Sequence, residues 1–162
     1  MKVLVMYYSR MGHAAQVAGV LEKELVARNA SVEVLRLHHE REPTLLGCAT
    51  EARRGARPEL IGLPKDVSGY DLVFLGFPTW GGRASSPANS MVAGVQNVSG
   101  KKCVLFSTSG FREGFVRGLN DVESSIKSLG GEVIDKQGFS LAERAKSNDR
   151  AVELVARVLG AG

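Results

Sequence analysis

The stretch Lys2–Val17, which reads KVLVMYYSRMGHAAQV, decides the fold. It starts with a short apolar run, Val3–Tyr8, continues with the small polar segment Ser9–Ala14, and takes on an amphipathic helical pattern from Ala15. A strand, a tight turn and a helix in this order aim free backbone N–H groups at an anion, because the first N–H groups of a helix lack intrahelical partners and lie at the positive end of its dipole. We therefore predict an anion-binding turn directly after the first strand.

The sequence of this turn excludes two common phosphate-binding loops. Gly12 lets the backbone approach a ligand closely, because glycine has no Cβ. The segment contains no Gly-Lys-Ser/Thr, so it is not a Walker loop. It also lacks the three spaced glycines of a dinucleotide-binding fingerprint. The anion is therefore expected in a turn of another kind.

Length and composition are those of an ordinary globular protein. The chain has 162 residues, of which 44% are hydrophobic and 23% charged, so we expect one domain over residues 1–162 with a good-sized core. The apolar stretches are too short to cross a bilayer, and Lys2 is followed by strand-like sequence in place of a signal peptide. We expect a cytoplasmic protein with no membrane partner.

Charge and cysteine content narrow the function classes. The net charge is +4, but Lys and Arg are spread along the chain, which favours a solvated surface over a nucleic-acid partner. Cys48 and Cys103 are too few for a disulfide framework or a metal cluster. His38 and His39 are adjacent and would point to opposite sides of a strand, so we expect no metal site.

Apolar runs alternate with helical patterns about five times along the chain. This alternation predicts an α/β fold with a parallel sheet covered on both faces and right-handed crossovers. Pro78 is expected to end the third strand. The predicted strands are Met1–Tyr8, Ser31–Leu37, Tyr70–Phe77, Lys102–Ser107 and Glu132–Phe139, and the predicted helices are Gln16–Arg28, Leu45–Arg54, Ala88–Gln96, Glu113–Leu129 and a last helix, capped by Ser147 or Asn148, that ends at Leu159.

Three loops that follow predicted strands carry unusual residues. They are Ser9–Ala14, Pro78–Arg83 and Thr108–Arg112, and they are rich in glycine, hydroxyl and aromatic side chains. In parallel sheets a ligand binds beyond the carboxyl ends of the strands, where the strand order reverses. We therefore expect these loops to meet at one ligand site.

The segment 38–65 is polar and harder to interpret. It contains three prolines and the arginine cluster Arg53, Arg54 and Arg57. The arginines could bind phosphate, but a solvated loop face is the more frequent role of such a cluster and is favoured here.

The sequence resembles the flavodoxin family over nearly its whole length. The resemblance is carried by YYSRMGHAAQVA near the start, then by GYDLVFLGFPTWGGRASSP, then by GKKCVLFSTSGF. It implies a three-layer, doubly wound, five-stranded parallel sheet with the strand order 2-1-3-4-5. It also implies FMN as the cofactor.

The resemblance assigns a part of the FMN site to each loop. In the family the first loop reads Ser/Thr-x-Thr-Gly-x-Thr and wraps the FMN phosphate; here Met11 and Ala14 stand where the family has threonines. The second loop places an aromatic residue and a glycine against the isoalloxazine ring, and the third borders the pyrimidine edge of that ring. The cofactor-binding residues so implied are Ser9, Arg10, Met11, Gly12, His13, Ala14, Pro78, Thr79, Trp80, Gly81, Gly82, Thr108, Ser109, Gly110 and Phe111.

Several of these residues have an alternative role. Arg10 would either contact the phosphate or lie in solvent, with neither role favoured. Trp80 would either stack on the flavin or belong to the core, and its setting in a loop favours stacking. Gly81 or Gly82 could turn a backbone carbonyl or N–H toward flavin N5. No catalytic acid, base or nucleophile is needed, because the flavin supplies the chemistry.

Three functions compete at this point. The first is an FMN-binding redox flavoprotein that transfers electrons to a partner protein or a small-molecule acceptor. The second is an FMN-dependent NAD(P)H or quinone reductase. The third is a flavin-free interaction module, which the missing threonines at Met11 and Ala14 favour and the intact Trp80 loop disfavours. The basic charge departs from the acidic electron carriers of the family, and the sequence leaves a homodimer open.

Overall fold

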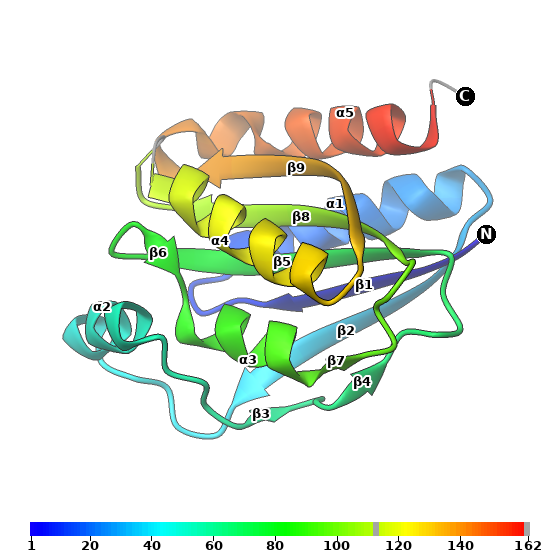
Figure 1. Cartoon of the computed structure of the whole chain (residues 1–162). Helices are drawn as coiled ribbons and strands as arrows, with labels where there is room; N and C mark the ends of the chain where they lie inside the picture. Colours follow the sequence, from blue (N-terminus) through cyan, green and yellow to red (C-terminus); the bar gives the residue numbers. More distant parts are fainter. Residues whose placement is uncertain (112–113, 161–162) are drawn as a thin grey trace.

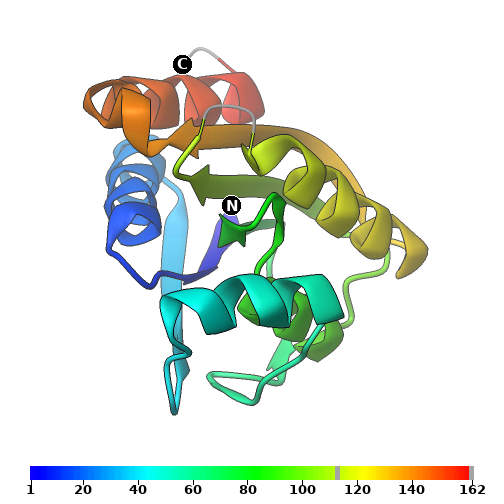
Figure 2. The same ribbon diagram turned by 90° about the vertical axis from the view of Figure 1, so that its left-hand side faces the viewer.

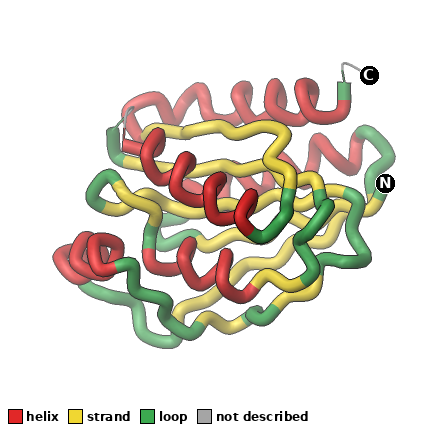
Figure 3. Tube along the Cα trace, viewed as in Figure 1, coloured by secondary structure: helices red, strands yellow, loops and turns green. Residues whose placement is uncertain are grey.

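A central sheet is covered by helices on both faces in the computed structural model, which describes residues 1–111 and 114–160 (Figure 1, Figure 2). The helices and strands alternate along most of the chain, as the colours of Figure 3 show. The strands are β1 (Lys2–Tyr8), β2 (Ser31–His39), β3 (Leu60–Ile61), β4 (Lys65–Asp66), β5 (Leu72–Trp80), β6 (Arg83–Ala84), β7 (Val95–Gln96), β8 (Lys102–Ser109) and β9 (Glu132–Ser140). The helices are α1 (His13–Ala27), α2 (Leu45–Arg54), α3 (Ser86–Gly94), α4 (Gly114–Ser128), the 3-10 helix η1 (Leu141–Lys146) and α5 (Ser147–Leu159).

The five long strands form a parallel sheet in the order β2-β1-β5-β8-β9. In β1, Val3 lies opposite Val32 of β2 on one side and opposite Leu72 of β5 on the other. Counted over the five predicted strands, this is the order 2-1-3-4-5, so the predicted fold class is confirmed. The strand order reverses beside β1, which places the carboxyl end of β1 where a ligand is expected.

The sheet separates two apolar cores, because successive residues of β1 point to opposite faces. Val3 and Val5 pack with α1 and α5, whereas Leu4 and Met6 pack with α3 and α4. Burial on both faces explains why the strands appear in the sequence as continuous apolar runs.

Two-residue strands were not predicted from the sequence. β3 adds to the edge of β2, and β6 pairs with the end of β5, so the sheet has seven strands in the described part of the chain. β4 and β7 pair separately. Two residues per strand are too few to show a period in the sequence.

Pro78 does not end its strand, contrary to the prediction, because β5 continues to Trp80. β1 pairs with β5 only as far as Gly76, so the N–H that Pro78 lacks removes no bond to β1. The Pro78 carbonyl accepts from the Ser85 N–H just after β6. The second predicted loop is therefore a hairpin, in which a tight turn joins β5 to β6.

Helix boundaries shift by a few residues. α1 begins at His13, three residues before the predicted start. α3 begins at Ser86, two residues early, with a proline in its first turn, where that residue is favoured. α2 has the predicted bounds and is capped by the Thr44 hydroxyl. The predicted residue Glu113 of α4 lies outside the described residues.

Ser147 is not the cap of α5 but its first residue, and Lys146 occupies the cap position. The Ser147 hydroxyl instead forms a hydrogen bond with His13.

In residues 1–111 and 114–160 no helix has the length and apolarity needed to cross a bilayer. The same residues contain no group of three or more His, Cys, Asp or Glu side chains suited to a metal ion.

Candidate functional site

A cavity of about 140 Å³ lies at the carboxyl ends of β1, β5 and β8. It brings together residues from all three predicted loops, which are far apart in the sequence. Its lining consists of Ser9, Arg10, Met11, His13, Ala14, Pro78, Thr79, Trp80, Thr108, Ser109, Gly110 and Leu141. The lining contains no carboxylate, so the cavity suits an anionic or aromatic ligand.

The first loop leads directly into α1. Gly12 is the N-cap residue, with a φ of 89°, and no side chain caps the helix. This φ lies in the left-handed region, which favours glycine. The N–H groups of the first turn therefore lack intrahelical acceptors, and they lie at the positive end of the helix dipole. This end of α1 has the properties of an anion site.

Contacts within the protein hold this loop in place. The Ser9 hydroxyl accepts a hydrogen bond from the Gly12 N–H at 3.1 Å. The Arg36 guanidinium of β2 donates to the Ser9 carbonyl at 3.1 Å. The loop is thus shaped before a ligand arrives, which reduces the entropic cost of binding.

Arg10 is held by contacts within the protein and does not lie free in solvent, which was one of its two predicted roles; its contact with a phosphate stays a prediction. Its Nη2 donates to the Pro43 carbonyl at 3.0 Å, and its Nε lies 3.8 Å from a Glu42 carboxylate oxygen. The side chain is therefore held against the segment that precedes α2, although it also lines the cavity.

His13 is buried at the start of α1 and reaches α5. Its Nε2 lies 3.0 Å from the Ser147 hydroxyl, and its Nδ1 has no hydrogen-bond partner among the described residues. Burial, together with the positive charge of Arg144, lowers the pKa of His13. At neutral pH the imidazole is therefore uncharged, and His13 adds no positive charge to this end of α1.

Trp80 lies at the end of β5, half-buried, and lines the cavity. Its ring meets Tyr8 edge to face, with the centroids 6.1 Å apart and the planes at 82°. The Tyr8 hydroxyl donates to Glu42, and burial is the main cause that raises the pKa of Tyr8. Trp80 packs partly on the core, as one of the two predicted alternatives has it, and it also borders the cavity; stacking on a flavin stays a prediction.

Gly81 and Gly82 form the turn between β5 and β6. Their φ values are 58° and 75°, the left-handed conformation that a two-residue hairpin of this type requires. α2 lies against this turn, since a Cβ added at Gly81 would be 3.6 Å from the Cβ of Ala49. Neither glycine lines the cavity.

The third loop supplies hydroxyl and backbone groups. Thr79 and Ser107 share a hydrogen bond of 2.7 Å, and the Ser109 hydroxyl donates to the Phe111 carbonyl. The Phe111 side chain is 81% exposed and does not line the cavity. Arg112, predicted as the end of this loop, lies outside the described residues.

The structure thus places twelve residues around the cavity, and eleven of them are among the predicted site residues. Gly12, Gly81, Gly82 and Phe111 lie beside it without lining it. Leu141 was not predicted as a site residue, because it belongs to a short 3-10 helix that leaves no periodic pattern in the sequence. Ser147 was missed for a different reason, since its contact with His13 spans 134 residues of sequence.

Comparison with known proteins adds independent information. The model of the flavodoxin family, described as "Flavodoxin", matches residues 48–156. No curated protein matches the chain significantly.

Solved structures resemble this chain over nearly its full length. A candidate flavoprotein from Bacteroides uniformis ATCC 8492 has a TM-score of 0.68 at 20% identity, over 92% of this chain and 96% of the other. Flavodoxin 2 from Bacillus cereus has a TM-score of 0.65 at 18% identity, over 98% and 99%. A flavodoxin from the domain Archaea has a TM-score of 0.59 at 15% identity, over 98% and 99%. At these identities the likeness concerns the fold.

Proposed function

This chain belongs to the flavodoxin family, and from that premise we propose that it binds FMN and transfers electrons to a partner. The observation that carries the proposal is the cavity at the start of α1, which gathers all three predicted loops. A flavin would supply one- and two-electron redox chemistry there, and the protein would bind and orient it.

The phosphate of FMN fits the uncapped start of α1. The left-handed Gly12 has no atom within 4 Å of the position that a Cβ would occupy, so the backbone is open to a ligand. First-turn N–H groups would donate to the phosphate oxygens, supported by the helix dipole. The Ser9 hydroxyl accepts from Gly12 and can still donate its own proton outward.

The isoalloxazine ring fits between Trp80 and the third loop. Trp80 offers an aromatic face, and backbone amides of Thr108–Gly110 can bond the polar edge of the ring. The cavity of about 140 Å³ is smaller than the roughly 300–1,000 Å³ of most small-molecule pockets. We therefore expect the protein to enclose only part of the flavin, leaving one edge exposed to a redox partner.

The small volume also favours a second candidate, the flavin-free interaction module. The two candidates differ in a direct measurement, because the chain contains a single tryptophan, Trp80. Its fluorescence reports on the proposed ring site alone.

The test is a titration of the purified protein with FMN, with riboflavin as the matched ligand that lacks the phosphate. We expect saturable quenching of Trp80 and a perturbed flavin absorption spectrum. Riboflavin should bind at least about tenfold more weakly, because it loses the charge-assisted hydrogen bonds of the phosphate. Absence of both quenching and spectral change would favour the flavin-free module.

A second measurement separates an electron carrier from a reductase. The FMN-loaded protein is mixed with NAD(P)H and a quinone, and NAD(P)H oxidation is followed at steady state. We expect no turnover above that of free FMN, since an electron carrier needs no site for a second small substrate. Sustained turnover would assign the protein as a reductase.

A further inference from the structure

We propose that the outer face of α2, together with the arginines beside it, is a docking surface for an acidic protein. This docking surface consists of Leu45, Leu46, Arg53, Arg54, Arg57 and Arg83. A role of this surface in electron transfer rests on the proposed function, because the surface borders the proposed flavin site.

α2 is anchored by one side and exposed on the other. It buries only Cys48 and Ala52. Leu46 and Arg53 are seven positions apart and so share a helical face, and both are exposed. Leu45 and Leu46 expose 74% and 86% of their surface. An apolar pair beside charged residues on one helix is typical of a protein-binding surface rather than a solvated one.

The side chains of these arginines are not paired within the part of the chain that the structure describes. Arg53, Arg54, Arg57 and Arg83 form no ion pair or hydrogen bond through their side chains within residues 1–111 and 114–160. Two carboxylates close to these arginines in the sequence have other contacts: Glu42 with Tyr8 and Arg10, and Glu51 with Ser86.

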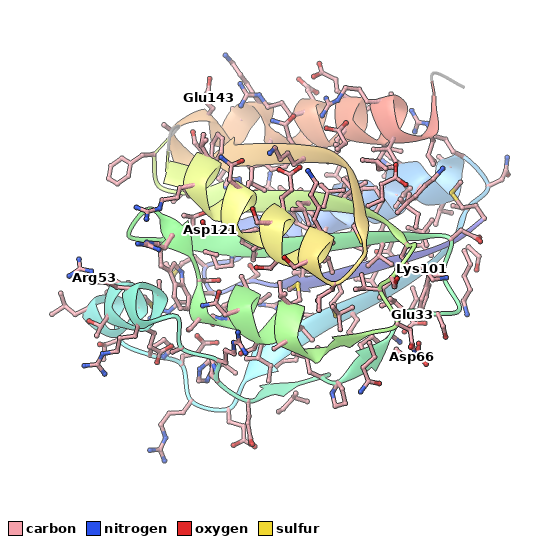
Figure 4. The ribbon with its side chains drawn as sticks, viewed as in Figure 1. Glu33, Arg53, Asp66, Lys101, Asp121 and Glu143 are labelled. Carbon is pink, nitrogen blue, oxygen red and sulfur yellow. The ribbon has the colours of Figure 1, made fainter. Side chains whose placement is uncertain are left out.

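Three of the arginines meet at one hollow. Arg53, Arg54 and Arg83 line a depression of about 310 Å³ between α2, β6 and α4, in which Asp121 is the single carboxylate. In Figure 4, Arg53 projects away from the body of the protein, and Asp121 lies on α4. Guanidinium groups bind carboxylates in a bidentate manner, so the hollow suits an Asp or Glu side chain of a partner.

The docking surface lies beside the candidate flavin site. Arg83 is paired with Trp80 across the hairpin, and Ala49 of α2 contacts the turn at Gly81. In Figure 2, α2 lies across the same end of the molecule as the hairpin and the start of α1. A partner bound to α2 would therefore lie beside the exposed edge of the flavin. The exposed leucines favour a protein over a nucleic acid, whose backbone offers chiefly phosphates.

The test uses the flavin-free protein and a fluorescein-labelled acidic [2Fe–2S] ferredoxin, followed by fluorescence anisotropy at low salt. We expect saturable binding that weakens as salt is added. The pair Arg53→Glu and Arg54→Glu should weaken binding about tenfold or more, and Leu46→Ser about threefold. The pair Arg53→Gln and Arg54→Gln should also weaken binding, but by a smaller factor. This variant adds no acidic residues at the end of α2, so a folding defect caused by such residues cannot explain its weaker binding.

The matched control reverses two charges elsewhere. Lys23 and Lys102 are exposed and have no side-chain partner among the described residues. The pair Lys23→Glu and Lys102→Glu gives the same change in net charge, and we expect it to leave the affinity within about twofold of the wild type. Equal weakening by this control would overturn the proposal, as would the absence of binding at low salt.

Polyuridylic acid serves as the competing anionic probe. If it binds more tightly than ferredoxin and Leu46→Ser leaves its binding unchanged, the surface recognises nucleic acid and the proposal is overturned. Because neither measurement needs flavin, a negative result here would leave FMN binding standing. Failure of the FMN titration would likewise leave the docking result intact.

Discussion

The two ends of the sheet differ in how their polar side chains are used. At the amino end, Glu33 accepts from Lys65 at 2.6 Å and also from the Tyr70 hydroxyl. Lys101 donates to the carbonyls of Ser68 and Tyr70. In Figure 4, Glu33, Asp66 and Lys101 lie together at this end, far from Arg53 at the other.

At the carboxyl end, several polar groups have no partner among the described residues. These include the Nδ1 of His13 and the hydroxyls of Ser85 and Ser140. α1 begins there without a side-chain cap. Buried groups left unpaired cost stability, and these gather at the end of the sheet where the candidate site lies. The amino end, in contrast, serves stability.

The largest effect is expected from Gly12→Val. A β-branched residue is strained at a φ of 89°, and its side chain would occupy the approach to the anion site. FMN affinity, measured by titration, should fall at least about a hundredfold, or about 2.7 kcal/mol.

Gly100→Val is the matched control at the amino end. Gly100 has a φ of 72° and, like Gly12, has no atom within 4 Å of the position that a Cβ would occupy. Both variants should lose about 1–3 kcal/mol of unfolding free energy through strain. An equal loss of FMN affinity in both variants would contradict a special role for the start of α1.

The next effect is expected from Trp80→Ala. Loss of the aromatic face should weaken FMN binding about tenfold, or about 1.4 kcal/mol. Because Trp80 is only half-buried, denaturant melts of the flavin-free protein should show a loss below the roughly 3–5 kcal/mol typical of a buried tryptophan. A large stability loss with unchanged flavin affinity would instead assign Trp80 to the core.

A smaller gain is expected from Met11→Thr. Met11 is 75% exposed beside the anion site, so a threonine hydroxyl there could donate to the phosphate without disturbing the core. A neutral hydrogen bond contributes about 0.5–1.5 kcal/mol, so FMN affinity should rise about two- to tenfold. Ala14 also lines the cavity but is only 2% exposed, so Ala14→Thr should bring a smaller gain, because its larger side chain has less room. Unchanged affinity in Met11→Thr would contradict this account.

The smallest effect is expected at the amino end, from Glu33→Gln. Hydrogen bonds from Lys65 and Tyr70 lower the pKa of Glu33 below its ordinary value of 4.5. The stabilisation is therefore present above pH 4.5 and is lost as the pH falls through the lowered pKa of the folded state. For an exposed pair we expect about 0.2–1 kcal/mol at pH 7.

Chemical denaturation at pH 7 and at pH 3 checks this prediction. The difference in unfolding free energy between wild type and Glu33→Gln should shrink at the lower pH, and FMN affinity at pH 7 should be unchanged. A change in FMN affinity would contradict the division of roles between the two ends of the sheet.

The sequence predicted the long parallel strands well, because buried strands such as β1 and β5 appear as continuous apolar runs. The loops after them were predicted from their glycine, hydroxyl and aromatic content. The sequence predicts a loop and not a hairpin at Gly81–Gly82, because β6 is too short to show alternation.

Contacts between distant segments were beyond sequence reasoning. Arg10 is positioned by the Pro43 carbonyl, and His13 contacts Ser147. No local sequence pattern indicates either pairing. The arginines after Leu46 were visible in the sequence, but no local pattern shows that Glu42 and Glu51 contact other residues in the fold.

The bond from Arg10 to Pro43 joins the first loop to the segment that leads into α2. This bond would provide thermodynamic linkage between the two proposed binding events. If an anion at the start of α1 draws Arg10 away from Pro43, the ordering of α2 changes, and with it the affinity for a partner. By reciprocity the partner must alter the affinity for the anion by the same factor. Loading with flavin and docking of a partner would then be coupled equilibria, with one arginine as the element that both ligands bias.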